Sequence, residues 1–446
     1  MQAFVSPIAH RKIQIEAYPK IVRAESTVVV RLKLDDLAPV GTKLQALFLS
    51  ANYPLTCDNK LELTVCSGWT EVTLNFEKEQ EYELAIYQDG IHTANTCFYA
   101  LNEDLFGRIP MKADFHMHTT SSDGDIDLKR APAKCRRVGL DLMAITDHRL
   151  YEPSVEAIAY YQDIPIDLIM CPGEEIHAPD NIVHIVNLNG NASVNKIWRE
   201  QEERYRAEVD DILKSMPESE LTAGEKYAVA SSYWVARKIK EFGGLAVFCH
   251  PYWMWYVGYS YDRFTQLPVQ IAKYITDGME DAIWASGEFD CVELIGGFGM
   301  IENDYDSDLR SAISYYEHLA KGQYLAPVGT SDCHRWEDDV RMGWYFTIAF
   351  AKEWSAQGFI DGVKEGYSVG CENYITRETG PRAWGSKRLC QYSQFLFREI
   401  YPEHDRLCEE ESTWMDAAAE GDQNSLNALK KASGRTQAYM RACFDK

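Results

Sequence analysis

Asp114-Phe115-His116-Met117-His118-Thr119-Thr120-Ser121-Ser122-Asp123-Gly124 is the stretch that decides how the middle of this chain folds. Side chains alternate between the two faces of an extended strand, so His116 and His118 point the same way and can share one metal ion. Asp123 follows in a turn rich in serine and glycine. The stretch therefore predicts one corner of a metal site at the end of a strand.

Short apolar runs predict further strands at 142–146, 166–171, 182–188, 245–249, 291–295 and 325–329, and further candidate histidines and acidic residues lie within or just after several of them. In an α/β barrel the carboxyl ends of the strands form one face, so ligands distant in sequence can converge there. Nine imidazoles and carboxylates exceed what one tetrahedral ion needs, which indicates two or three ions. The predicted metal ligands are His116, His118, Asp123, His148, Glu175, His184, His250, Asp332 and His334.

The pattern of apolar and polar residues divides the chain into three parts. Residues 1–108 alternate apolar and polar positions over several short runs, which predicts an all-β sandwich. Residues 109–384 alternate apolar runs with amphipathic helices, for example after Asp127 and over 196–216 and 309–319, which favours a (β/α)7-type barrel. Residues 385–446 predict helices, with Leu389, Tyr392, Leu396 and Ile400 in one stripe and a second helix after Asp422. For this tail we expect docking or dimerisation, with Lys430, Lys431 and Arg435 on a solvated face.

Composition narrows the class of protein. A 446-residue chain with 46% apolar residues can bury a large core. Its formal charge of −23 argues against duplex nucleic acid or an anionic membrane as a partner. The sequence lacks a run long enough to span a membrane, and its start lacks a secretory pattern, so we expect a cytoplasmic protein. Twelve cysteines without a Cys-x-x-Cys pair predict reduced, packed thiols, including Cys249 and Cys333.

In these motifs the sequence resembles the polymerase and histidinol phosphatase (PHP) family of metal-dependent phosphoesterases, over residues 109–370. The resemblance implies a distorted barrel, usually seven-stranded, with up to three ions such as zinc, manganese or iron. It implies that the first ion is held by His116, His118, Glu175 and Asp332, the second by Glu175, His184 and His250, and the third by Asp123, His148 and His334. An aspartate at this position, Asp123 in Ser-Asp-Gly, is similar to the branch of the family that acts on nucleotide-type phosphates.

For several residues near these ligands the sequence leaves more than one role open. The doublet Glu174-Glu175 leaves a one-residue ambiguity, and we choose Glu175 because it directly precedes Ile176, as the Gly-x-Glu pattern of the resembled family requires. His177 is either a further ligand, a catalytic proton donor or a neutral neighbour. Arg149 and Arg335 directly follow ligands, so each is a candidate phosphate clamp or a surface salt partner. Asp147 orients a ligand or caps the next turn.

The predicted activity is hydrolysis of a small phosphomonoester or a nucleotide-type phosphate. Two cations that share a water lower its pKa toward neutrality, so the catalytic group is a metal-bound hydroxide. One enzymatic alternative is a histidinol-phosphate phosphatase. From another class, the chain could be a non-catalytic binding or regulatory protein whose sandwich recognises a glycan or a protein. An aromatic stretch over 251–261, including Trp253, is either a wall for a ring-bearing substrate or a packing surface. We expect a homo-oligomer, if one forms, to use the tail or the sandwich.

Overall fold

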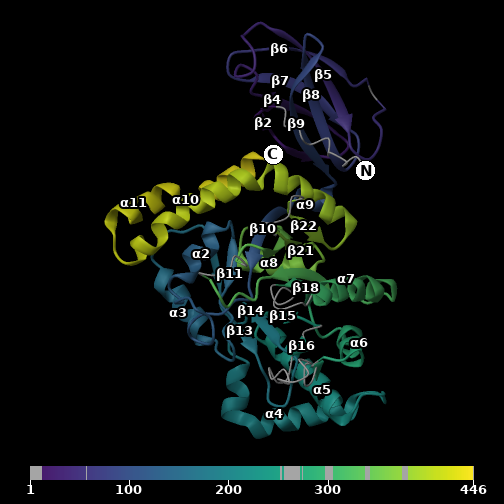
Figure 1. Cartoon of the computed structure of the whole chain (residues 1–446), viewed down its shortest axis with the longest axis vertical. Coiled ribbons are helices and arrows are strands. Elements are labelled where there is room, and N and C mark those ends of the chain that lie inside the picture. The colour runs from purple at the N-terminus through teal and green to yellow at the C-terminus, as the bar shows by residue number, and fades with distance from the viewer. Residues whose placement is uncertain are drawn as a thin grey trace, which may run out of the picture. The chain divides into compact units, whose positions relative to one another are not determined.

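The computed structural model describes residues 13–56, 58–251, 254–255, 272–273, 275–296, 305–336, 342–373 and 380–444. The chain divides into two compact units (Figure 1). The first comprises Met1–Ile109, Gln394–His404 and Gly434–Lys446, and the second comprises Pro110–Ser393 and Asp405–Ser433. Residues of the predicted C-terminal part thus contribute to both units.

The first unit consists mainly of short strands in two sheets. One sheet has the order β1-β9-β8-β5-β6, with β3 also paired to β9, and the other has the order β2-β4-β7. The predicted alternation is confirmed in β4, where Val28, Val30 and Leu32 are buried. Phe48 of β5 packs edge to face on Phe76 of β7, with 5.4 Å between ring centroids, so the two sheets share one core. The strands are β1 (Ile13–Gln14), β2 (Ala17–Tyr18), β3 (Ile21–Arg23), β4 (Ser26–Leu32), β5 (Lys43–Ser50), β6 (Lys60–Thr64), β7 (Thr70–Phe76), β8 (Gln80–Gln88) and β9 (Ile91–Leu101).

The second unit is a mixed α/β structure with two larger sheets, ordered β12-β11-β10-β20-β21-β22 and β13-β14-β15-β18-β19. Their strands are β10 (Ile109–Asp114), β11 (Leu142–Ala144), β12 (Ile169–Cys171), β13 (Gly173–Ile176), β14 (Ile185–Leu188), β15 (Leu245–Phe248), β18 (Cys291–Gly296), β19 (Ala326–Thr330), β20 (Tyr345–Ala351), β21 (Ser368–Glu372) and β22 (Arg382–Trp384). A small third sheet pairs β16 (Met254–Trp255) with β17 (Ala272–Lys273). The six predicted strand positions of this part are therefore confirmed.

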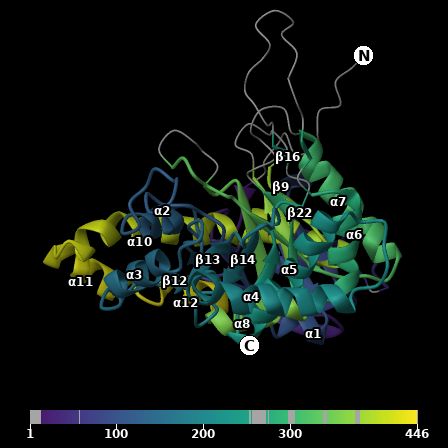
Figure 2. The same ribbon diagram turned by 90° about the horizontal axis from the view of Figure 1, so that it is seen from below.

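Within the second unit, helices lie on both sides of these strands. Figures 1 and 2 show α2 and α3 on one side and α6 and α7 on the other. The helices are α2 (Ala131–Arg137), α3 (Glu152–Tyr161), α4 (Asn195–Ser215), α5 (Ala223–Glu241), α6 (Asp277–Ser286), α7 (Tyr305–Ala320) and α8 (Ala356–Lys364). The short α1 (Glu103–Phe106) belongs to the first unit, and the C-terminal helices are α9 (Lys387–Glu399), α10 (Tyr401–Ala419), α11 (Gln423–Ala432) and α12 (Arg435–Ala442).

The start of α2 differs from the prediction. Asp127 does not cap this helix, because its side chain accepts the N–H of Lys129 in the preceding turn, 2.8 Å away. The helix begins at Ala131, and Pro132 occupies its first turn, where a missing backbone N–H costs nothing. The helix expected after Asp422 is observed as α11, and Asp422 caps it, since its carboxylate accepts the N–H of Ser425.

The expected seven-stranded barrel is not closed by the strands that the structure describes. The hydroxyl of Thr347 in β20 accepts the N–H of Gly329 and donates to its carbonyl, at 3.0 and 2.8 Å. A side chain therefore binds the backbone N–H and carbonyl of Gly329 that strand pairing between β19 and β20 would use. The backbones of β19 and β21 nevertheless approach closely, because a Cβ on Gly370 of β21 would lie 2.7 Å from the carbonyl oxygen of Val328 in β19.

Three further predictions concern the exposed basic residues, the cysteines and the membrane-spanning segments. Lys430 and Lys431 are exposed, as expected, whereas Arg435 is partly buried. All eleven described cysteines are free thiols, and Cys249 and Cys333 are buried. None of the described helices combines the length and the apolar character needed to cross a membrane.

Candidate metal centre

All nine predicted ligands come together at one edge of the two sheets of the second unit. The strands β10, β11, β15 and β19 end shortly before their ligands, and β13 carries Glu175 itself. β14 runs antiparallel to β13 and β15, so His184, which precedes β14, comes to the edge where those neighbours end. Isolated bridges between Met117 and Cys333 and between His148 and Glu175 join the two sheets at this edge.

Four side chains surround a first position. The Oδ1 atom of Asp332 lies 2.9 Å from Nε2 of His118 and 3.3 Å from Nε2 of His116. The oxygens of Glu175 lie 3.6 Å and 3.7 Å from the same two nitrogens. Ligand atoms around a tetrahedral ion with bonds of about 2.0–2.1 Å stand about 3.3 Å apart. The donor set and its spacing therefore fit one metal ion.

Unsatisfied atoms in this first position support the same conclusion. Nε2 of His116 is buried and has no hydrogen-bond partner among the described residues, and both oxygens of Glu175 are buried among imidazole nitrogens. A buried polar atom without a partner is costly, and each such atom calls for an explanation. A cation between them would satisfy these atoms together.

A second position lies on the other side of Glu175. Its Oε1 atom is 2.9 Å from Nδ1 of His184 and 3.5 Å from Nε2 of His250. The backbone of His250 has a φ of 27°, which is rare outside glycine, so this ligand is held in a strained turn. Glu175 can therefore bridge two ions.

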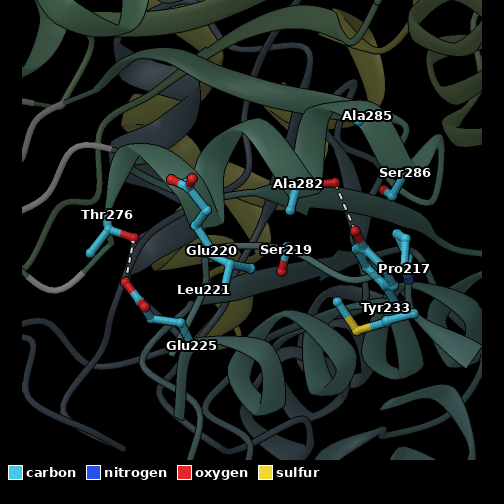
Figure 3. Close-up of a pocket in the computed structure, with 12 residues that line it drawn as sticks. Pro217, Ser219, Glu220, Leu221, Glu225, Tyr233, Thr276, Ala282, Ala285 and Ser286 are labelled. Carbon is cyan, nitrogen blue, oxygen red and sulfur yellow. Dashed lines mark hydrogen bonds between the residues drawn. The ribbon is translucent and has the colours of Figure 1, made fainter. Parts of the chain in front are cut away.

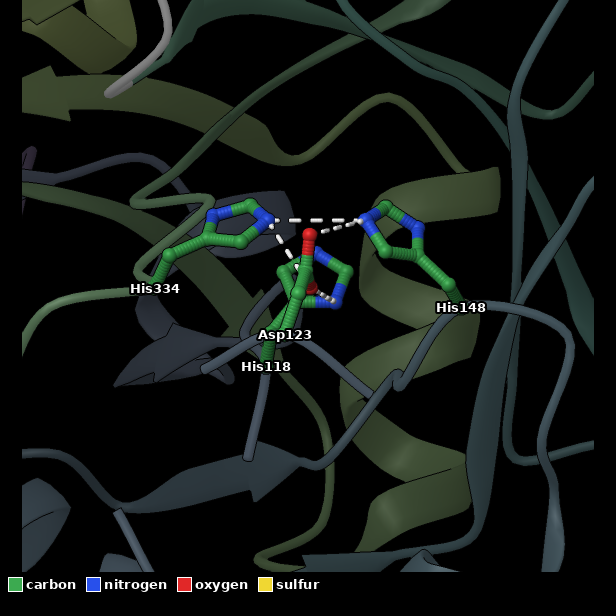
Figure 4. A group of neighbouring side chains, drawn as sticks. All are labelled: His118, Asp123, His148 and His334. Atoms are coloured by element: carbon green, nitrogen blue, oxygen red, sulfur yellow. Dashed lines mark hydrogen bonds and ion pairs between the residues drawn. The ribbon is translucent and has the colours of Figure 1, made fainter. Parts of the chain in front are cut away.

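A third position is formed by Asp123, His148 and His334, which point toward one another in Figure 4. The carboxylate of Asp123 lies 3.3 Å from Nε2 of His148 and 3.4 Å from Nε2 of His334. The two imidazole nitrogens are 3.5 Å apart. Nδ1 of His118 lies 4.0 Å from Asp123, so this ring separates the third position from the first.

The protonation of these groups suits cation binding. Burial lowers the pKa of both His118 and His184 to about 4, so each is the neutral imidazole that binds metals. Burial acts in the same direction on His148, but the charge of Glu175 and hydrogen bonds to Asp123 and Glu175 raise its pKa to about 10. Partial burial favours a higher pKa for Asp123, yet the hydrogen bond and charge of His148, with the charge of His334, lower it to about 2. Without an ion, a proton on His148 balances the carboxylates that a cation would otherwise bind.

The geometry resolves the ambiguity between the two adjacent glutamates in favour of Glu175. Glu174 points away from the histidines and accepts hydrogen bonds from the side chains of Asn187, Ser193 and Asn195 and from the N–H of Val194. Its carboxylate therefore fastens the segment before α4 rather than a metal ion.

The loop that carries Asp123 is fastened by Asp147. The buried carboxylate of Asp147 accepts the N–H and the hydroxyl of Thr119, each at 2.7 Å, and the hydroxyl of Ser122 at 2.6 Å. The loop also folds back tightly at Gly124, where a Cβ would lie 2.2 Å from the carbonyl oxygen of His118. Asp147 thus orients the loop that carries Asp123.

His177 lies among the ligands. Its ring stacks on that of His184, with 3.7 Å between centroids. Its Nε2 atom lies 3.0 Å from Nδ1 of His148 and 3.2 Å from Oε2 of Glu175. His177 therefore lies on the same side as Glu175, and its role among the three alternatives stays open.

The two candidate arginines occupy exposed positions beside ligands. Arg149 follows His148 with a φ of 62°, and its carbonyl accepts a hydrogen bond from the guanidinium of Arg199. Arg335 follows His334 and is also exposed. Their role as phosphate clamps stays a prediction.

Sequence reasoning missed one acidic residue of the site. Glu293 in β18 lies 2.6 Å from Nδ1 of His116 through its Oε1 atom. It sits in a continuous apolar run, Cys291 to Ile295, and 177 residues separate it from His116. A charged residue inside a predicted buried strand was the signal that could have found it.

Other features lie away from the metal centre. A cavity of about 570 Å³ between the α4–α5 connection and α6 is shown in Figure 3. In its wall, Tyr233 donates to the carbonyl of Ala282, and Thr276 donates to Glu225. None of the predicted ligands lines it. Most of the aromatic stretch over 251–261 lies outside the described residues.

Comparisons with known proteins complete the description of the site. No protein-family model matches the chain, and no curated protein matches it. Among solved structures, the chain is similar to a two-domain protein containing a predicted PHP-like metal-dependent phosphoesterase from Bacteroides vulgatus. The identity is 18%, the match covers 60% of this chain and 66%, just under two thirds, of that one, and the TM-score is 0.38.

Two further solved structures are similar to the chain. One is a proposed metal-dependent phosphoesterase from Bifidobacterium adolescentis, with 20% identity over 50% of this chain and 87% of that one and a TM-score of 0.32. The other is an amidohydrolase from Chromobacterium violaceum with bound sulfate, with 18% identity over 51% and 89% and a TM-score of 0.31. These neighbours are PHP-like phosphoesterases and an amidohydrolase, and with such low TM-scores the function has to be argued from the site itself.

Proposed function

We propose that this chain is a metal-dependent hydrolase of phosphoesters that uses two or three divalent ions such as zinc, manganese or iron. The observation that carries the proposal is the convergence of nine imidazole and carboxylate ligands around three adjacent positions. We assign His116, His118, Glu175 and Asp332 to the first ion, Glu175, His184 and His250 to the second, and Asp123, His148 and His334 to the third.

The charge of the site supports the presence of cations. Three predicted ligands are carboxylates, and Glu293 is a fourth carboxylate beside them. Histidine charges hold the pKa of Glu175 and of Asp332 well below the usual range, although burial works in the opposite direction. Four ionised carboxylates carry the charge that two divalent ions would neutralise. Buried charge without compensation is strongly unfavourable, so a cation cluster is the natural occupant.

When bound here, divalent ions would lower the pKa of a shared water and neutralise phosphate oxygens. The chain's own groups do the rest. We propose that Arg149 and Arg335, which are exposed beside His148 and His334, pair with phosphate oxygens of the substrate. We propose that His177, whose Nε2 atom lies 3.2 Å from Oε2 of Glu175, serves the departing oxygen of the substrate as a proton donor.

We propose a small phosphorylated substrate of the nucleotide type. The support is the carboxylate of Asp123 at the third position, which the sequence resemblance connects with nucleotide-type phosphates. The net charge of −23 disfavours duplex nucleic acid, whereas a small anion needs only the local field of the ions.

We also propose that the two large sheets of the second unit are an opened form of the distorted (β/α)7-type barrel, and that the two sheets of the first unit form a β-sandwich. The shared core of the first unit and the two bridges at the ligand edge support these assignments. A homo-oligomer through the sandwich or the C-terminal helices remains a proposal on the sequence alone.

Elemental analysis of the purified protein, followed by phosphate release from nucleotides, sugar phosphates and dinucleotides, tests the proposal. Asp332→Asn keeps a residue that tolerates the φ of 46° at this position, and it should lower both metal content and turnover. His116→Ala should do the same, while His92→Ala in the first unit is the matched control. Full activity in metal-depleted His116→Ala protein would refute the metal mechanism. Bound metal without phosphate release from any compound would favour a binding or regulatory protein.

A further inference from the structure

Glu293 is the acidic residue that β18 contributes to the interior of the second unit. Its side chain is only 2% exposed. Its Oε1 atom lies 2.6 Å from Nδ1 of His116 and accepts the hydroxyl of Thr330 at 2.8 Å. Its Oε2 atom accepts the backbone N–H of His250 at 2.8 Å. One carboxylate thus connects three segments that carry predicted ligands.

The contact with His116 determines which ring nitrogen is available to an ion. A carboxylate accepts hydrogen bonds, so Nδ1 of His116 carries the proton that it donates to Glu293. Nε2 is then the ligand atom, and it faces Asp332 at 3.3 Å and Glu175 at 3.6 Å. A carboxylate behind a metal-binding histidine fixes the orientation of the ring and increases its basicity as a ligand.

The position of β18 explains why one residue can reach all three segments. β18 lies between β15 and β19 in the sheet, and these neighbours lead to His250 and Asp332. β18 itself carries none of the nine predicted ligands. The hydrogen bond from Glu293 to the backbone of His250 also restrains a residue whose φ of 27° is unfavourable.

Glu293 could instead be a direct ligand, because His116, Cys249 and Glu293 also lie close enough to hold an ion. The hydrogen bonds argue against this arrangement. Both oxygens of Glu293 already accept donors, from His116, Thr330 and His250. An ion at this place would have to displace the proton on Nδ1 and leave the Thr330 hydroxyl and the His250 N–H without acceptors.

We infer that Glu293 is a positioning residue, which holds Nδ1 of His116 protonated and presents Nε2 to the first ion while it restrains the turn at His250. This inference rests on the proposed metal centre and deepens it. It does not depend on the identity of the substrate.

Binding of Zn²⁺ alone, measured by competition with a chelator, tests the inference. Glu293→Gln preserves the shape of the side chain but replaces one acceptor oxygen with a donor, so we expect Zn²⁺ to bind the first position roughly 10–100-fold more weakly. Glu280→Gln is the matched control, since Glu280 is equally buried at 3% and accepts bonds from Trp284 and Ser314 elsewhere in the unit. Unchanged Zn²⁺ affinity in Glu293→Gln, or an equal loss in both variants, would overturn the inference.

A second measurement keeps the inference testable if Glu293→Gln does not fold. In ¹⁵N-histidine-labelled wild-type protein, Nδ1 of His116 should keep its proton with and without Zn²⁺, and only Nε2 should respond to the ion. Zinc on Nδ1 would overturn the inference. Weaker Zn²⁺ binding in the variant, in a protein that releases no phosphate, would refute the proposed function and leave the role of Glu293 intact.

Discussion

Removing the carboxylate of Asp123 should empty one ion position and leave the other two filled. Asp123 contacts Nε2 of His148 at 3.3 Å and Nε2 of His334 at 3.4 Å, and its side chain is 57% exposed. The amide of Asp123→Asn therefore leaves no buried atom without a partner. Glu175 differs, because its two oxygens face both the first and the second position.

The size of the effect follows from the role of each group. Losing a group that only hydrogen-bonds a metal ligand weakens binding about 10–100-fold. Asp123 would be a direct ligand and would be the one anionic group at the third position, so we expect at least a 100-fold loss there. This corresponds to about 2.8 kcal/mol.

The assay counts ions per chain after equilibration with graded concentrations of free Zn²⁺. Asp123→Asn should hold one ion fewer than the wild-type protein, and Glu175→Gln should lose two. Asp127→Asn is the control, since Asp127 is an exposed acid of the same loop whose carboxylate accepts the Lys129 N–H and contacts none of the nine predicted ligands. Wild-type stoichiometry in Asp123→Asn, or the loss of every ion, would refute a separate third position.

Three other changes have expected outcomes. His177→Gln should lower kcat about 100-fold at unchanged metal content, because a proton donor is removed and no assigned ligand; an unaltered kcat would mean that the ring only packs. Arg149→Ala should raise KM about ten-fold and keep the metal, since an exposed guanidinium at this edge would contact the substrate and no ion. Identical kinetics would mean that Arg149 is only a surface salt partner. Glu411→Leu should lower the free energy of unfolding in urea by roughly 3–5 kcal/mol, because it leaves buried Arg136 without the carboxylate 2.8 Å from its Nε. The double variant with Arg136→Met should recover most of this loss, and a single variant as stable as the wild type would contradict the burial of the pair.

Much of the ligand set was predictable because strands impose a period of two and end at one edge of a sheet. His116 and His118, just past the end of β10, both face Asp332, and His334 approaches Asp332 although the φ of 46° at Asp332 is not that of a strand. The choice between Glu174 and Glu175 was not decided by periodicity. It was decided by Asn187, which takes Glu174 into a different hydrogen-bond network.

Asp127 was wrongly predicted as a helix cap, and a closed barrel was not confirmed; at both places a single side chain competes with a regular pattern. Asp127 bonds within its own turn, so α2 starts later than its capping chemistry suggested. The hydroxyl of Thr347 occupies both backbone groups of Gly329, so the ladder that would close the barrel is interrupted there. Neither interaction leaves a mark in the apolar pattern.

By itself, the sequence determined the types of the candidate ligands, their placement at or near the ends of short apolar strands, and the acidic composition of the chain. Only the tertiary structure decided how these side chains are grouped in space, because that depends on distances between segments far apart in the chain. In the structure β14 runs antiparallel to its neighbours, so His184 reaches the edge where the other ligands lie, and Glu293 contacts Nδ1 of His116. Periodicity is a local property of the chain, whereas strand order and long-range contacts arise only when the sheets pack.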